Sequence, residues 1–213
     1  MDTISKRAQT FKEELANSLT HGLGILFGIV AICLMISLSV ISGGSIQILS
    51  TALFGSALLL MYTCSTLYHA VQHEKTKSLL RIFDHISIYI LIAGTYTPFL
   101  LLGIKGMYGW VLFIIIWVIA LFGIFFKVFF THRFPKLSLV LYLLMGWVAI
   151  FMGQTLYETL DRAVLILLVA GGFSYTIGTF FYIQKRMLYA HAIWHIFVLS
   201  GTSVHFVAVL LLL

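Results

Sequence analysis

No Asp, Glu, Lys or Arg occurs between residues 15 and 73 of this 213-residue chain. Further charge-free stretches cover residues 85–104, 106–126, 137–157, 163–184 and 187–213. Each is long enough for a membrane-spanning helix, which needs about 20 apolar residues. Only 9% of the residues are charged, against about 25% in an average soluble domain. The sequence therefore predicts an integral protein of the cell membrane and excludes a soluble one.

The first stretch is too long for one span, and the cluster Ser42-Gly43-Gly44-Ser45 is typical of a tight turn inside it. Dividing it there gives seven helices. Transmembrane β-strands are excluded because the apolar runs are twice as long as barrel strands of about 10 residues. We expect an all-α bundle forming one domain over residues 17–213, with spans at 17–41, 46–72, 81–104, 107–127, 136–155, 162–183 and 188–211.

Lys and Arg residues are distributed unevenly between the two sides of this bundle. Only Lys105 and Arg162 lie on one side. The other side carries eleven, which are Lys6, Arg7, Lys12, Lys75, Lys77, Arg81, Lys127, Arg133, Lys136, Lys185 and Arg186. Because short cytoplasmic loops retain positive charge, we expect a cytoplasmic N-terminus and an extracellular C-terminus. The net charge of +6 then reflects topology and anionic headgroups and indicates no nucleic-acid partner.

Residues 1–16 precede the first predicted span. Ile4, Ala8, Phe11 and Leu15 recur there at helical spacing among charged residues. This pattern predicts a short amphipathic segment on the inner leaflet of the membrane.

Polar residues within the spans gather at one depth. Ser65 and His69 end the second span, Asp84 opens the third, and His191 and His195 open the seventh. Alternate spans run in opposite directions, so all five positions fall within about two helical turns, ~10 Å, of the cytoplasmic surface. Ionisable groups at membrane depth are costly and by default indicate a functional site.

The histidines of this cluster suit a metal ion. His191 and His195 lie at i and i+4 on one helix face, and His69 adds a third imidazole at the same depth. Three histidines leave the fourth tetrahedral position of Zn²⁺ open, as catalytic zinc sites require. Because no Cys or Met accompanies them, softer metals are less suited. The sequence predicts zinc at His69, His191 and His195.

Asp84 and Ser65 are the candidate catalytic residues beside this metal. Asp84 either belongs to the metal site or is neutralised by Arg81, one turn earlier. Ser65, four residues before His69, is either a packing hydroxyl or a donor to a substrate carbonyl. His205 lies ~15 Å deeper than His195, too far to share its metal, and is expected to pack or hydrogen-bond. His21 either lines the site or hydrogen-bonds at the start of its helix.

Taken together, these motifs resemble the bacterial hemolysin III proteins, which belong to the progestin and adipoQ receptor superfamily and are distantly related to alkaline ceramidases. The matching features are Glu14-x2-Asn17-x2-Thr20-His21-x2-Gly24, Ser65-x3-His69, Asp84, Thr95-x2-Pro98, and His191-x3-His195 with His205. The resemblance implies an internal N-terminus and zinc held by His69, His191 and His195, with Ser65 and Asp84 beside it.

The function expected from these residues is zinc-assisted hydrolysis of a membrane lipid amide or ester, with Asp84 as the base and Ser65 polarising the carbonyl. Two alternatives stay open. One is a non-enzymatic regulator of membrane homeostasis, or a receptor-like protein, in which zinc is structural. The other is a pore-forming cytolysin, although no polar stripe follows any span.

Overall fold

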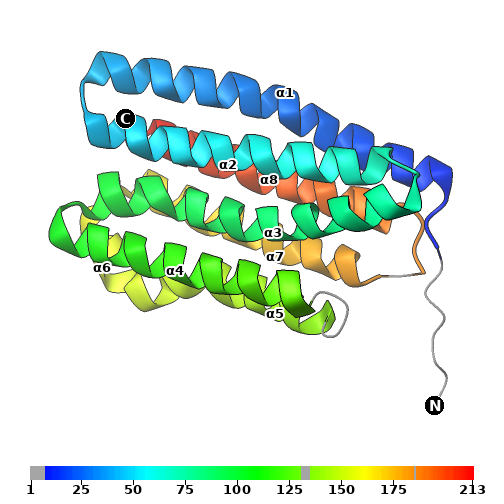
Figure 1. Cartoon of the computed structure of the whole chain (residues 1–213). Helices are drawn as coiled ribbons and strands as arrows, with labels where there is room; N and C mark the ends of the chain where they lie inside the picture. The colour runs from blue at the N-terminus through cyan, green and yellow to red at the C-terminus, as the bar shows by residue number, and fades with distance from the viewer. Residues whose placement is uncertain (1–7, 131–134, 185) are drawn as a thin grey trace.

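The computed structural model describes residues 8–130, 135–184 and 186–213. Within these ranges the chain is helical without strands, and seven segments are long and apolar enough to cross a membrane. The predicted all-α multi-pass fold is therefore confirmed. Figure 1 shows the spans side by side, with the start of the first span and the end of the last at opposite ends of the bundle. The elements are α1 (Phe11–Ser42), α2 (Ser45–Ala70), α3 (Glu74–Pro98), η1 (Phe99–Ile104), α4 (Gly106–Phe130), α5 (Pro135–Gly146), η2 (Val148–Met152), α6 (Gly153–Thr159), α7 (Arg162–Ile183) and α8 (Ala190–Leu210).

The predicted turn between the first two spans is confirmed. α1 ends at Ser42 and α2 begins at Ser45. Gly43 adopts φ 83° and donates its N–H to the Ser39 carbonyl. This left-handed conformation costs other L-residues about 1–2 kcal/mol, so glycine suits a turn this tight.

α1 begins at Phe11, six residues before the predicted span. Thr10 caps it by accepting from the Glu13 N–H, while the Glu13 carboxylate accepts from the Thr10 N–H at 2.9 Å. This capping box extends the helix through the later part of the segment predicted to be amphipathic. The earlier part of that segment, residues 1–7, lies outside the described residues.

The third span changes helix type at its far end. α3 ends at Pro98 and continues as the π-helix η1 over Phe99–Ile104. Proline removes a backbone donor, so a change of helix type beside it has a local cause.

The predicted span at 136–155 is found as Leu137–Thr159, but it is not one regular α-helix. α5 stops at Gly146, the 3₁₀ segment η2 follows, and α6 continues to Thr159. The Tyr96 hydroxyl donates to the Gly146 carbonyl at 2.7 Å and accepts from the Ala149 N–H at 2.9 Å. Irregular backbone inside a membrane protein must be satisfied in this way, by a neighbouring side chain.

Packing in the bundle centres on α3, which is the most buried of the seven spans. α2 and α4 pack against it, α1 packs against α2 and α8, and α7 packs against α8. Many large apolar side chains of α1, α4 and α7 are exposed on the outside. In a membrane this surface faces lipid, so the polar residues inside carry the functional information.

Candidate metal centre

His69, His191 and His195 converge although they come from opposite ends of the chain. One ring nitrogen from each lies within 4.8 Å of the other two. His69 ends α2 and His195 lies in the first turns of α8, and both side chains are 2% exposed. The predicted clustering of these three histidines is thus present in the structure as a potential metal-binding triad.

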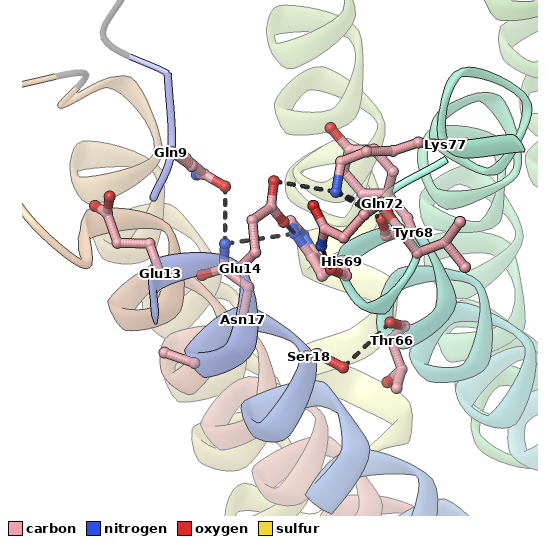
Figure 2. A network of polar contacts seen from close by, with 12 residues as sticks. Gln9, Glu13, Glu14, Asn17, Ser18, Thr66, Tyr68, His69, Gln72 and Lys77 are labelled. Atoms are coloured by element: carbon pink, nitrogen blue, oxygen red, sulfur yellow. Dashed lines mark hydrogen bonds and ion pairs between the residues drawn. The ribbon is translucent and has the colours of Figure 1, made fainter. Parts of the chain in front are cut away.

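Glu14 of α1 orients the His69 ring (Figure 2). Its carboxylate oxygen lies 2.7 Å from Nδ1 of His69, and its other oxygen lies 3.1 Å from Nζ of Lys77. A carboxylate accepts, so Nδ1 carries a proton, and in the neutral ring Nε2 is the nitrogen with the lone pair. Nε2 is buried without a hydrogen-bond partner among the described residues. This is the arrangement in which a carboxylate holds a metal-ligating imidazole.

His195 is oriented by the same stretch of α1. Its Nδ1 lies 3.1 Å from the Asn17 carbonyl oxygen and 3.1 Å from the Thr20 hydroxyl. The carbonyl can only accept, which assigns the proton to Nδ1 and the lone pair to Nε2. In the neutral form of these two rings, Nε2 is therefore the nitrogen with the free lone pair, the form that binds a metal.

Glu13 ties the start of α8 to α1. Its carboxylate accepts from the Tyr189 N–H at 3.1 Å. Tyr189 is the residue before α8 and has a left-handed φ of 56°. The first turns of α1 thus hold both the entry to the helix that bears His191 and His195 and the ring of His69.

These roles of α1 were not predicted, because the pattern of residues 1–16 indicated only an amphipathic segment on the inner leaflet. The spacing of polar residues at the start of α1 could have indicated these roles. Glu14, Asn17 and Thr20 recur at intervals of three, so they lie near one face of a helix. This face of α1 points toward the histidine triad, which explains why polar residues recur along it.

His21 forms part of the wall beside the triad. Its ring stacks on His195 with centroids 3.5 Å apart, and it meets Tyr62 edge to face. Neither ring nitrogen has a hydrogen-bond partner within the described chain. Of the two predicted roles, the structure favours the site wall over hydrogen bonding at the start of the helix.

Asp84 and Ser65 lie together next to the triad. Ser65 is buried and Asp84 is half-buried, and the Ser65 hydroxyl and the His69 ring are both close enough to influence the Asp84 carboxylate. Arg81 and Lys127 act on Asp84 only through longer-range charge. Among the described residues no ion pair within 4.0 Å joins Asp84 to Arg81. Direct neutralisation by Arg81 is therefore not the arrangement found.

An elongated apolar cavity of about 540 Å³ adjoins these residues. Asp84, Ser65 and His195 line one end, and Phe99 and Leu156 line parts farther along. Along α3 the lining runs from Asp84 to Phe99, about 22 Å at 1.5 Å per residue. The volume lies in the range of ligand pockets, roughly 300–1,000 Å³. His69 and His191 are not in the lining, so His195 is the triad member that reaches the cavity.

The deeper histidine, His205, behaves as predicted. Its Nε2 donates to the Leu168 carbonyl at 3.0 Å, far from the triad along α8. Its ring also lines the cavity.

Comparison with known proteins identifies the family. A model of haemolysin-III-related proteins matches residues 9–206. The chain is 49% identical over 94% of both chains to the "Hemolysin-3 homolog" of Bacillus subtilis (strain 168). It is 42% identical to "Hemolysin-3" of Bacillus cereus, over 98% of this chain and 95% of that protein. A human protein named "Monocyte to macrophage differentiation factor" is 28% identical, over 94% and 84% respectively. The chain therefore belongs to the haemolysin-III-related family of multi-pass membrane proteins.

Proposed function

We propose that this protein is a zinc-dependent hydrolase that cleaves an amide or ester bond of a membrane lipid. The observation that carries the proposal is the position of the His69–His191–His195 triad. It lies at one end of an apolar cavity whose wall also contains Asp84 and Ser65. Ligands for a metal, an acid–base group and a space for an acyl chain are thus next to one another.

The donor set fits zinc. Three imidazoles without a thiolate or thioether match the nitrogen ligands of catalytic zinc sites. Glu14 and Asn17 fix the tautomers of His69 and His195, and the buried Nε2 of His69 otherwise lacks a partner. A bound Zn²⁺ supplies Lewis-acid polarisation of a carbonyl and lowers the pKa of a water in its open position.

Asp84 is positioned to serve as the general base. It lines the cavity at the triad end, interacts with His69, and is the acidic residue that the cavity lining contains. In this role a carboxylate oxygen of Asp84 takes the proton from the attacking water and later delivers it to the leaving group. The Ser65 hydroxyl holds Asp84 in place or donates to the scissile carbonyl.

The cavity suits the hydrocarbon part of a lipid. Its lining beyond Asp84 and Ser65 is mostly apolar, and it extends about 22 Å along α3. Burial of an acyl chain there places the carbonyl end beside the triad and excludes bulk water from the reacting bond.

Two other functions remain as competing outcomes. A structural zinc site would clamp α2 and α8 without turnover. A cytolysin, as the name of the Bacillus cereus relative suggests, would need a polar path through the bundle. The metal-ligand triad and its neighbouring carboxylates, Asp84 and Glu14, instead gather at one end of the bundle, which favours a site over a pore.

The test uses purified full-length protein in lipid nanodiscs, loaded with zinc. Release of fatty acid is measured from a panel of lipid amides and esters, with zinc content and melting temperature recorded in parallel. We expect turnover by the wild type and a fall of roughly 10² to 10⁴ in Asp84→Asn, with zinc retained. Asp161→Asn, at the start of α7, serves as the matched control and should keep wild-type turnover.

A zinc-loaded wild type that turns over no lipid in the panel, together with a destabilised Asp84→Asn protein, would contradict the hydrolase and favour the clamp. Such destabilisation is the expected effect of breaking a structural charge cluster.

A further inference from the structure

Two polar rings interrupt the apolar wall of the cavity at a distance from the triad. His205 of α8 and Tyr175 of α7 both line the cavity, with ring centroids 5.6 Å apart. Nδ1 of His205 and the hydroxyl of Tyr175 are buried and lack a hydrogen-bond partner among the described residues. An unpaired buried polar group costs about 1–3 kcal/mol, so two such groups side by side call for a ligand.

The bundle is shaped to hold these rings. Gly171 of α7 faces His205, and a Cβ there would lie 2.2 Å from Nε2 of the ring. Gly201 of α8 faces Tyr175, and a Cβ there would lie 2.9 Å from the Tyr175 ring. Each helix therefore supplies a glycine for the polar ring of its neighbour. A side chain at either glycine would displace the ring that packs on it.

The hydrogen-bond capacity of the pair is defined. Because Nε2 of His205 donates to the Leu168 carbonyl at 3.0 Å, Nδ1 is left as an acceptor. The Tyr175 hydroxyl can donate. One donor and one acceptor together match a single alcohol, which accepts from Tyr175 and donates to His205. A ketone would satisfy only Tyr175, and a methylene would satisfy neither.

We propose that His205 and Tyr175 form a second polar subsite that recognises a hydroxyl group near the middle of an acyl chain. The proposal rests on the proposed function in one respect, the placement of the carbonyl end of the lipid at the triad. His205 follows His195 by ten residues of helix, about 15 Å. An extended chain advances about 1.3 Å per carbon–carbon bond of 1.5 Å, which places the hydroxyl at about carbon 12.

The experiment measures binding of free fatty acids to the full-length protein in detergent, by displacement of a fluorescent fatty acid. The probes are stearate, 2-hydroxystearate, 12-hydroxystearate and 12-oxostearate. We expect 12-hydroxystearate to bind about tenfold more tightly than stearate, as two added hydrogen bonds suggest. The 2-hydroxy and 12-oxo compounds should not share this preference.

Variants assign the preference to the two rings. Tyr175→Phe keeps the ring that packs on Gly201 and removes only the hydroxyl, so it should lower the preference to about threefold. His205→Leu removes the acceptor and should lower the preference to a similar level. Tyr108→Phe, on α4 and outside the cavity lining, is the matched control and should leave it unchanged. Tyr175→Phe keeps the test valid if His205→Leu fails to fold.

Equal affinity of the wild type for stearate and 12-hydroxystearate would overturn the subsite, since a bridging water would then explain the two polar atoms. So would a preference that stays about tenfold in both variants. Because binding is measured without turnover, a preference found in a protein that hydrolyses no lipid would support the subsite while contradicting the hydrolase.

Discussion

The carboxylate of Glu14 lies 2.7 Å from Nδ1 of His69, and this contact joins the first turns of α1 to the last turn of α2. The same carboxylate contacts Nζ of Lys77, which also donates to the Tyr68 and Val71 carbonyls at the end of α2. Glu14 thus fixes the His69 ring relative to the backbone that carries it. For this reason α1, which supplies no triad member, determines the geometry of the triad.

The first prediction concerns Glu14→Gln. A neutral amide removes the charged partner of both Nδ1 of His69 and Lys77, so the His69 ring loses its fixed orientation and part of its basicity. Zinc affinity should fall by about 10- to 100-fold, the usual effect of losing such a supporting carboxylate. The measurement is competition with a chelator of known zinc affinity.

Glu158→Gln is the matched control for that experiment. Glu158 is exposed on α6 and accepts from Gln154 rather than from a histidine. The zinc affinity of the Glu158→Gln protein should equal that of the wild type. Wild-type affinity in Glu14→Gln would show that the Glu14–His69 contact has no part in metal binding.

The sequence predicted the parts of this molecule that depend on composition and on regular spacing. The span count follows from charge-free length, and the convergence of His69 with His191 and His195 follows from a shared depth. The support from Glu13, Glu14 and Asn17 was not predicted because it depends on contacts between residues far apart in the chain. Periodicity within one helix does not specify such contacts.

The break in the fifth span was missed for a similar reason. Residues 137–155 are mostly apolar and uncharged, and no proline interrupts them. The break depends on Tyr96 of α3, whose hydroxyl pairs with Gly146 and Ala149 across the bundle. Only a tertiary contact distinguishes this segment from an ordinary helix.

Tyr96→Phe tests that account of the break. The substitution leaves the Gly146 carbonyl and the Ala149 N–H without their shared partner, in a region without bulk water. We expect a loss of about 1–3 kcal/mol in the free energy of unfolding. Reversible unfolding in mixed micelles measures it. Tyr108→Phe, half-exposed on α4, should change stability by less than about 0.5 kcal/mol. Equal stability of both variants would refute the bridging role of Tyr96.

The predicted orientation can be tested with reporters fused to the full chain. Eleven positive residues on one side against two on the other predict that a reporter after Lys77 is cytoplasmic and one after Leu213 is extracellular. Alkaline phosphatase and green fluorescent protein fusions distinguish the two sides. A fluorescent, cytoplasmic C-terminal fusion would contradict either the orientation or the odd number of crossings.

The metal content of the purified protein tests the central claim most directly. Elemental analysis should find about one Zn²⁺ per chain in the wild type, and the same in the control His73→Ala, whose side chain caps α3 and lies outside the triad. The triple variant His69→Ala/His191→Ala/His195→Ala should contain almost none, because zinc sites in proteins depend on three or four direct ligands. One zinc per chain in that triple variant would contradict the account.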